Sequence, residues 1–263
     1  MGLLLCTKAA QRAFYYEKLD VNLWSLQELA YVLVRYPVII PERFVDRKLT
    51  NWLRTELGQE TLAGKLEQYL NVEDTDHQAR LLMMILKEAN YHKDSEIAAF
   101  EAEYRKLKNV EPHQFQTMLG DAYFRMERYG KAMEAYEEAI RTGGDVNVSM
   151  KLGCTYVTVM QYDKASDIFE EIFVETNHDE PLKRLYFISR LEPSVDTIEK
   201  YRENIPEETF ADWEAQYQAA YRKVEQSERM QSVSEIYKKD KAEFRTQAKL
   251  MLVKWKKEYR DRI

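Results

Sequence analysis

One pattern of residues occurs twice in the middle of the chain, first at 113–145 and again 33 residues later at 146–178. The matched positions are Leu119 and Leu152, Gly120 and Gly153, Tyr123 and Tyr156, Tyr129 and Tyr162, Ala132 and Ala165, and Tyr136 and Phe169. A fixed period of roughly 20 to 50 residues is typical of proteins that stack one supersecondary unit on the next. Agreement at so many positions with one offset argues against two ordinary amphipathic helix pairs that match by chance. The pattern therefore predicts a stacked-repeat architecture.

The paired glycines indicate how the two helices of each copy meet. Gly120 and Gly153 fall inside the expected first helices, where Gly is less favourable than Ala by about 1 kcal/mol. Such a Gly is best explained by the close approach of another helix, which leaves no room for a side chain. Ala132 and Ala165 are the small residues expected to face these glycines from the second helices. The tyrosines are expected to fill the space between neighbouring repeats.

These residues resemble the tetratricopeptide repeat (TPR) family. That family has a large residue, Leu-Gly and Tyr on its first helix, and Ala, an aromatic residue and Ala on its second. The last Ala is Ala139 in the first copy but Ile172 in the second, and Gly144 and Asn177 stand where the family usually has Pro. The resemblance implies an all-α fold, a TPR-like α-solenoid of antiparallel helix pairs. It also implies a non-catalytic protein-interaction scaffold that binds a protein or peptide partner on its concave face.

We expect three segments along the chain. Residues 1–72 form a mostly helical N-terminal unit in which 13–24 could pair as a short hairpin, and 207–263 form a C-terminal helical extension or cap. Between them, 73–206 hold TPR-like repeats: the two clear copies, a degenerate helix pair before them and another after them. The expected helices outside the clear copies are 25–36, 46–58, 60–70, 76–90, 94–109, 178–192, 194–204, 207–226 and 233–261. Capping-box patterns mark Ser25–Glu28 and Thr75–Gln78 as helix starts.

Composition supports a helical chain. The chain has only 8 Gly and 6 Pro in 263 residues, so it has few of the residues that form the tight turns between strands. The two cysteines, Cys6 and Cys154, are too far apart in sequence to suggest a disulfide framework, so we expect a cytoplasmic protein. The opening MGLLLC has neither the basic start of a signal peptide nor the Ser or Thr of a myristoylation signal. The N-terminal unit as a whole resembles weakly the opening of repeat proteins from clostridial bacteria, which implies a bacterial origin and adds no known activity.

The charge of the chain is unevenly distributed. Residues 234–263 contain ten Lys or Arg and five Asp or Glu, a net of +5, so the remainder of the chain carries −6 − 5 = −11. One interpretation is an aromatic-faced helix that caps the solenoid, with its basic side in solvent. The other is an adaptor that binds nucleic acid or an anionic membrane through the basic C-terminal helix. Self-association through the C-terminal helices is a further option, and the oligomeric state stays open.

The resemblance to the TPR family also locates a partner-binding groove on the first helices. The expected lining is Arg80, Met83, Lys87 and Tyr91 in the degenerate pair, Gln114, Thr117, Asp121, Phe124 and Arg125 in the first clear copy, and Asn147, Met150, Cys154, Val157 and Thr158 in the second. This mixture of polar and apolar side chains suits an extended or helical peptide. The alternative, nearly as well supported, is that the C-terminal helices of the same chain fill the groove.

One TPR activity is excluded by the residues present. Members that bind chaperone tails grip a C-terminal Asp or Glu with a clamp of Lys, Asn, Asn, Lys and Arg. Here Thr117 and Asp121 replace the first Lys and Asn, and Lys151 replaces the second Asn. Asp121 would repel a carboxylate, so we expect no recognition of such a tail.

The sequence offers no catalytic, metal-binding or cofactor-binding motif. It lacks a Gly-rich phosphate loop, H-E-x-x-H and G-x-S-x-G. The four histidines (77, 92, 113 and 178) lack the spacing of metal ligands. We therefore expect no enzyme activity, no metal and no cofactor.

Overall fold

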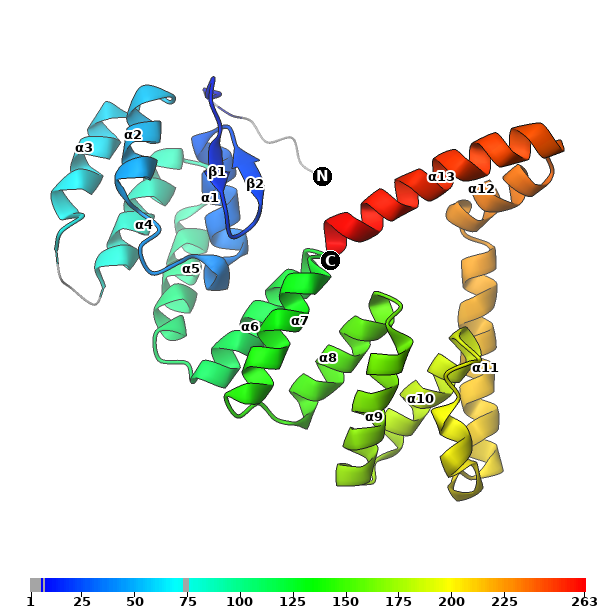
Figure 1. Cartoon of the computed structure of the whole chain (residues 1–263). Helices are drawn as coiled ribbons and strands as arrows, with labels where there is room; N and C mark the ends of the chain where they lie inside the picture. Colours follow the sequence, from blue (N-terminus) through cyan, green and yellow to red (C-terminus); the bar gives the residue numbers. More distant parts are fainter. Residues whose placement is uncertain (1–5, 7, 73–75) are drawn as a thin grey trace. The chain divides into compact units, whose positions relative to one another are not determined.

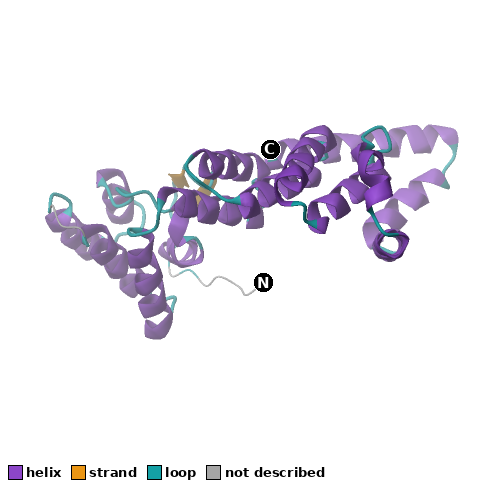
Figure 2. Cartoon of the chain, turned by 90° about the horizontal axis from the view of Figure 1, so that it is seen from below, coloured by secondary structure: helices purple, strands orange, loops and turns teal. Residues whose placement is uncertain are grey.

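The computed structural model describes residues 6, 8–72 and 76–263 (Figure 1). The chain divides into two compact units, Met1–Ala122 and Tyr123–Ile263, which we call unit 1 and unit 2. Among the described residues, strands occur only in one short hairpin, and helices make up most of the rest (Figure 2). The fold is therefore all-α, as the sequence predicts. The three-segment division at 72 and 206 follows repeat similarity and stays a prediction.

Unit 1 begins with the hairpin expected at 13–24. Strands β1 (Phe14–Tyr16) and β2 (Val21–Leu23) pair antiparallel, with Phe14 opposite Leu23. An isolated two-stranded hairpin is marginally stable in water, so this one needs a surface to pack on. The ring of Phe14 lies 5.6 Å from Trp52, and the hydroxyl of Tyr16 donates to the carbonyl of Ile39 at 3.0 Å. The inward face of the hairpin is thereby buried against helical segments.

Six helices and a 3₁₀ turn follow the hairpin in chain order. They are α1 (Leu26–Arg35), η1 (Pro37–Ile39), α2 (Arg47–Thr55), α3 (Glu60–Tyr69), α4 (His77–Ala89), α5 (Asp94–Leu107) and α6 (Pro112–Arg125). The start of α1 is capped as expected, because the Ser25 hydroxyl accepts the backbone N–H of Glu28 at 3.1 Å. Thr75, the expected cap of α4, lies outside the described residues.

Helix α4 is the central helix of unit 1. It packs against α1, α3 and α5, and Leu81, Leu82, Ile85 and Leu86 are fully buried on it. A helix with buried residues on most of its sides belongs in a core rather than at a surface. Asn90, in the left-handed conformation with φ 46°, ends α4 and turns the chain toward α5.

Unit 2 contains the end of α6 and the remaining helices. They are α7 (Tyr129–Arg141), α8 (Val146–Thr158), α9 (Tyr162–Thr176), α10 (Asp179–Leu191), η2 (Thr197–Asn204), α11 (Glu207–Glu225), α12 (Glu228–Tyr237) and α13 (Lys241–Arg262). Helices α7 to α10 pack in succession, each against the next, as in a TPR-like solenoid (Figure 1).

The Gly of the second repeat lies in close contact with its partner helix. A Cβ added at Gly153 on α8 would lie 2.5 Å from Cε1 of Phe169 on α9. Phe169 and Ala165 are both fully buried. The close approach of the two helices inferred from the sequence is thus present in the second repeat, but the side chain against Gly153 is that of Phe169 rather than the expected Ala165.

The pattern changes one repeat later, where Tyr186 occupies the Gly position, 33 residues after Gly153. Its side chain is buried, its hydroxyl donates to the carboxylate of Glu214 on α11, and its ring lies 4.8 Å from Phe210 and 5.9 Å from Trp213. Burial and the neighbouring carboxylate raise the pKa of Tyr186 to about 12. The expected second α-helix at 194–204 is instead the 3₁₀ helix η2, which still packs against α10. Helix α11 packs against the side chain of Tyr186.

The C-terminal helices also differ from expectation. The single helix expected at 233–261 is two helices, because Asp240 caps a new start by accepting the backbone N–H groups of Ala242 and Glu243. One interpretation of the sequence is that the aromatic stripe of α13 caps the repeats. Two of its residues face α12: Phe244 lies 5.2 Å from Tyr237, and the Arg229 guanidinium lies 5.5 Å from the Trp255 ring.

Only the last residues of α13 reach the repeats. The Tyr259 hydroxyl donates to the carbonyl of Val159 at 3.2 Å, and Arg262 pairs with Glu127 at 2.8 Å. A Cβ at Gly130 would collide with the carbonyl oxygen of Ile263. The Arg128 guanidinium also donates to the carbonyl of Asp261 at 3.0 Å. No residue of α13 is buried, so contacts at its C-terminal end hold it against the turns before α7 and α9.

We predict that Gly153→Ala destabilises the chain by about 1–3 kcal/mol, although Ala is the better helix former, because the new methyl group overpacks the contact with Phe169. The midpoint of thermal unfolding, followed by circular dichroism, is the measurement. Gly64→Ala on α3 is the matched control: its Cβ would meet nothing within 4 Å, so stability should rise slightly. A Gly153→Ala midpoint at or above that of Gly64→Ala would contradict the close approach.

Gly130→Ala should release the end of α13, because its methyl group would occupy the position of the Ile263 carbonyl. Hydrogen exchange of the amides of 256–262 should become faster, while α8 and α9 keep their protection. Glu127→Gln, which removes only an exposed ion pair worth about 0–1 kcal/mol, should change this exchange much less. Unchanged exchange in Gly130→Ala would show that the contact does not persist in solution.

Candidate protein-binding face

The five groove residues predicted on α8 share one side of that helix. Asn147 and Thr158 are exposed, and Met150, Cys154 and Val157 are half-buried. The buried residues of α8 face the other way and include Val148, Leu152 and Tyr156. The helix thus directs its core residues to α7 and α9 and leaves a mixed polar and apolar face accessible.

The N-terminus of α8 is fixed by a local network. The Asp145 carboxylate accepts the backbone N–H of Asn147 at 3.0 Å and its side-chain amide N–H at 2.9 Å. These hydrogen bonds, led by the side chain of Asn147, lower the pKa of Asp145. Asn147 is therefore held in one orientation at the exposed end of the face.

Cys154 lies at the centre of this face but has no sign of nucleophilic activation. Burial raises the pKa of its thiol, and the nearby charges of Arg184, which lowers the pKa, and Glu180, which raises it, do not reverse that effect. A thiol with a raised pKa is protonated near neutral pH and reacts poorly. Cys154 therefore contributes a small apolar contact to the face, and its charged neighbours place α10 beside α8.

Helix α10 adds residues to this face that the sequence analysis did not identify. Lys183 and Phe187 follow Met150 and Cys154 by the same 33 residues, and both are half-buried. The Lys183 ammonium lies 5.9 Å from the centre of the Phe187 ring, within the range of a cation–π contact. Applying the repeat offset once more would have found both residues. The change at the Gly position concealed this third copy.

Helix α11 covers the far end of α10. The Arg190 guanidinium lies 3.4 Å from the Glu214 carboxylate and 5.3 Å from the centre of the Tyr217 ring. Of the C-terminal helices, α11 therefore lies beside the α10 end of the candidate face. Asn147 and Thr158 nevertheless stay exposed in their presence, so the α8 part of the face is accessible within unit 2.

The two remaining predicted residues of unit 2 lie at the end of α6. Phe124 is half-buried and meets Tyr129 edge-on at 5.3 Å, and Arg125 is exposed. Phe124 therefore acts mainly in packing the α6–α7 turn, and Arg125 offers a charged group at the surface.

The predicted residues of unit 1 are mixed in accessibility. On α6, Gln114 is exposed, and Thr117 and Asp121 are half-buried. On and after α4, the exposed residues are Arg80, Lys87 and Tyr91. Met83 is buried, at 8% exposure, and so belongs to the core of α4. That these residues line one groove with those of unit 2 stays a prediction.

In the part of the chain that the structure describes, no three or more His, Cys, Asp or Glu side chains gather in a way that could hold a metal ion. The described helices also include none with both the length and the apolar character needed to cross a membrane.

Comparison with known proteins gives one match. The family model described as tetratricopeptide repeat matches residues 113–142, which include most of the first clear repeat. No curated protein and no solved structure matches the chain. The match coincides with the Leu119-Gly120 copy of the pattern, and the helices after it pack in succession. Residues 113–142 are therefore a tetratricopeptide repeat.

Proposed function

We propose that the chain is a non-catalytic scaffold that binds a protein or peptide partner through the first helices of its repeats. TPR repeats in general mediate protein–protein interaction, and the matched repeat supports that role here. The observation that carries the proposal is the face of α8 and α10, where half-buried Met150, Val157 and Phe187 lie between exposed polar residues. Apolar anchors surrounded by a polar rim are the usual composition of a protein-binding surface.

The shape of the expected partner follows from the spacing of this face. Side chains that recur at intervals of three and four residues along α8 form a row, and α10 contributes a second row beside it. Two adjacent rows suit a helix or an extended peptide whose apolar side chains enter between them. With free cysteines at 6 and 154, we place this interaction in the cytoplasm.

A binding experiment can test the face before the partner is identified. Val157→Glu with Thr158→Arg puts charge and bulk on the accessible side of α8, and we expect partner proteins retained by the unmodified chain to be lost. The measurement is affinity capture from nuclease-treated cytosol, with circular dichroism to confirm folding. Glu134→Lys, exposed on the second helix α7, is the control and should retain the same proteins. Equal retention by all three forms would remove the face from the proposal.

A chaperone-type tail should not bind. A peptide ending in Glu-Glu-Val-Asp meets Thr117 and Asp121 where a clamp would supply Lys and Asn, so we expect a Kd weaker than about 1 mM. Isothermal titration with the full chain checks this. Saturable micromolar binding would show that other basic residues replace the clamp.

A second candidate function is an adaptor for nucleic acid or an anionic membrane. The observation in its favour is the set of exposed lysines on α13, among them Lys249, Lys256 and Lys257. Retention of RNA, duplex DNA or phosphatidylserine vesicles that falls steeply with added salt would support it.

A further inference from the structure

Helix α13 has an apolar surface that stays exposed among the described residues of unit 2. Leu250 is 66% exposed and Val253 59% exposed. These residues are three apart, so they lie on one side of the helix. On the same side, Lys254 and Lys257 follow Leu250 at intervals of four and seven, and Lys249 and Lys256 flank Val253 at intervals of four and three. All four lysines are exposed, so two aliphatic side chains are surrounded by positive charge.

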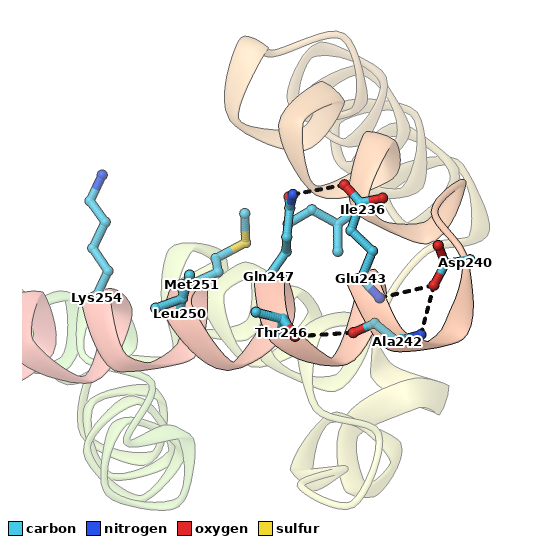
Figure 3. A pocket seen from close by; sticks show the side chains of 9 residues that line it. All are labelled: Ile236, Asp240, Ala242, Glu243, Thr246, Gln247, Leu250, Met251 and Lys254. Carbon is cyan, nitrogen blue, oxygen red and sulfur yellow. Dashed lines mark hydrogen bonds between the residues drawn. The ribbon is translucent and has the colours of Figure 1, made fainter.

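A hollow of about 770 Å³ adjoins this surface, in the angle between α12 and α13 (Figure 3). Its apolar lining comes from Ile236 on α12 and from Leu250 and Met251 on α13. Lys254 stands at one end, and Asp240 and Glu243 stand at the other. A concave apolar site with charge at its ends admits side chains from another protein, whereas a flat bilayer surface would leave its floor empty.

The outer side of α9 has the opposite character. Helix α9 carries five Asp or Glu and one Lys, a net of −4, and Val174 on it is 72% exposed. Asp167, Glu171 and Glu175 recur every four residues beside Val174, and all three are exposed. Glu170 does not belong to this side, because Lys200 pairs with it at 2.9 Å. The accessible side of α9 is thus an acidic row beside one aliphatic residue.

The two surfaces correspond in length as well as in charge. With a rise of 1.5 Å per residue, the row from Asp167 to Glu175 and the row from Lys249 to Lys257 each span about 12 Å. Two such helices laid side by side can pair their charges along the whole row. In the same arrangement, Val174 meets Leu250 and Val253 at the mouth of the hollow.

We propose that α13 of one copy of this chain docks on α9 of a second copy, so that the protein self-associates head to tail. Helix α13 carries eight Lys or Arg and three Asp or Glu, a net of +5, so a symmetric α13–α13 contact would place like charges together. Charge therefore selects the heterologous contact, in which the surface used differs between the two partners. The proposal does not depend on the proposed binding face of α8 and α10.

Sedimentation of the full chain over a concentration series tests the proposal directly. We expect reversible association with a Kd on the order of 10 µM at about 0.05 M salt, and much weaker association at about 0.5 M salt, where exposed charges are screened. A chain that stays monomeric at both salt concentrations would overturn the proposal and leave α13 to a partner of another sequence.

Charge reversal identifies the two surfaces. Lys254→Glu with Lys257→Glu reverses the α13 row, and Asp167→Lys with Glu171→Lys reverses the α9 row. Each double variant alone should associate at least tenfold more weakly than the unmodified chain. An equal mixture should recover association, because reversed α13 complements reversed α9 and the unmodified faces complement each other. Circular dichroism confirms that both variants stay folded.

The controls separate a specific contact from a general effect of charge. Lys18→Glu with Lys106→Glu makes the same charge change at exposed positions of unit 1 and should leave association unaltered. Leu250→Ser with Val253→Ser keeps every charge and should still weaken association, because the aliphatic contact is lost. Failure of the mixture to recover, or equal loss in the unit 1 control, would overturn the α9–α13 assignment.

Discussion

Unit 2 depends on the contact between Gly153 on α8 and Phe169 on α9. Because Gly153 has no Cβ, the ring of Phe169 occupies the space that any side chain would need. The cost of Gly within a helix, about 1 kcal/mol, is offset by the complete burial of a large aromatic ring. The small Ala165, also fully buried, lets the two backbones approach. The helix pair is thus held in one geometry, from which the accessible side of α8 follows.

The end of the repeats follows from the loss of the same contact. Tyr186 stands at the Gly position of α10, and its large ring must be covered by another helix. Phe210 and Trp213 on α11 provide that cover, and Trp213 is buried in doing so. Solenoids need an end that closes their core, and here the closing element is α11 rather than the basic last helix. Helices α12 and α13 are therefore not needed to close the core of the repeats.

The sequence predicts the parts of this fold that depend on local patterns. The repeat offset locates α7, α8 and α9, and the hairpin and the cap at Ser25 follow from short-range residue choices. It fails where a distant residue decides the outcome. Nothing near 194–204 shows that the segment will form a 3₁₀ helix rather than an α-helix, and the aromatic period of 237–259 runs across the break that Asp240 makes. For the candidate face, the α8 residues could be placed from the pattern. Met83 could not, since its burial depends on how α4 is surrounded.

Charge and burial together explain why α13 stays exposed within its own chain. Exposure of Leu250, Leu252 and Val253 costs about 25 cal/mol for each Å² of apolar surface, unless something covers them. The contacts of α13 with the repeats lie at its C-terminal end, at Tyr259, Arg262 and the backbone of Asp261 and Ile263, and not at the middle of the helix. A helix that served only as a solvated cap would need no aliphatic residues there. The same stretch carries lysines on the side of those residues, and the acidic row of α9 is the matching surface within this sequence. The exposed apolar residues of α13 are thus best understood as one half of an intermolecular contact, with Val174 on the other half.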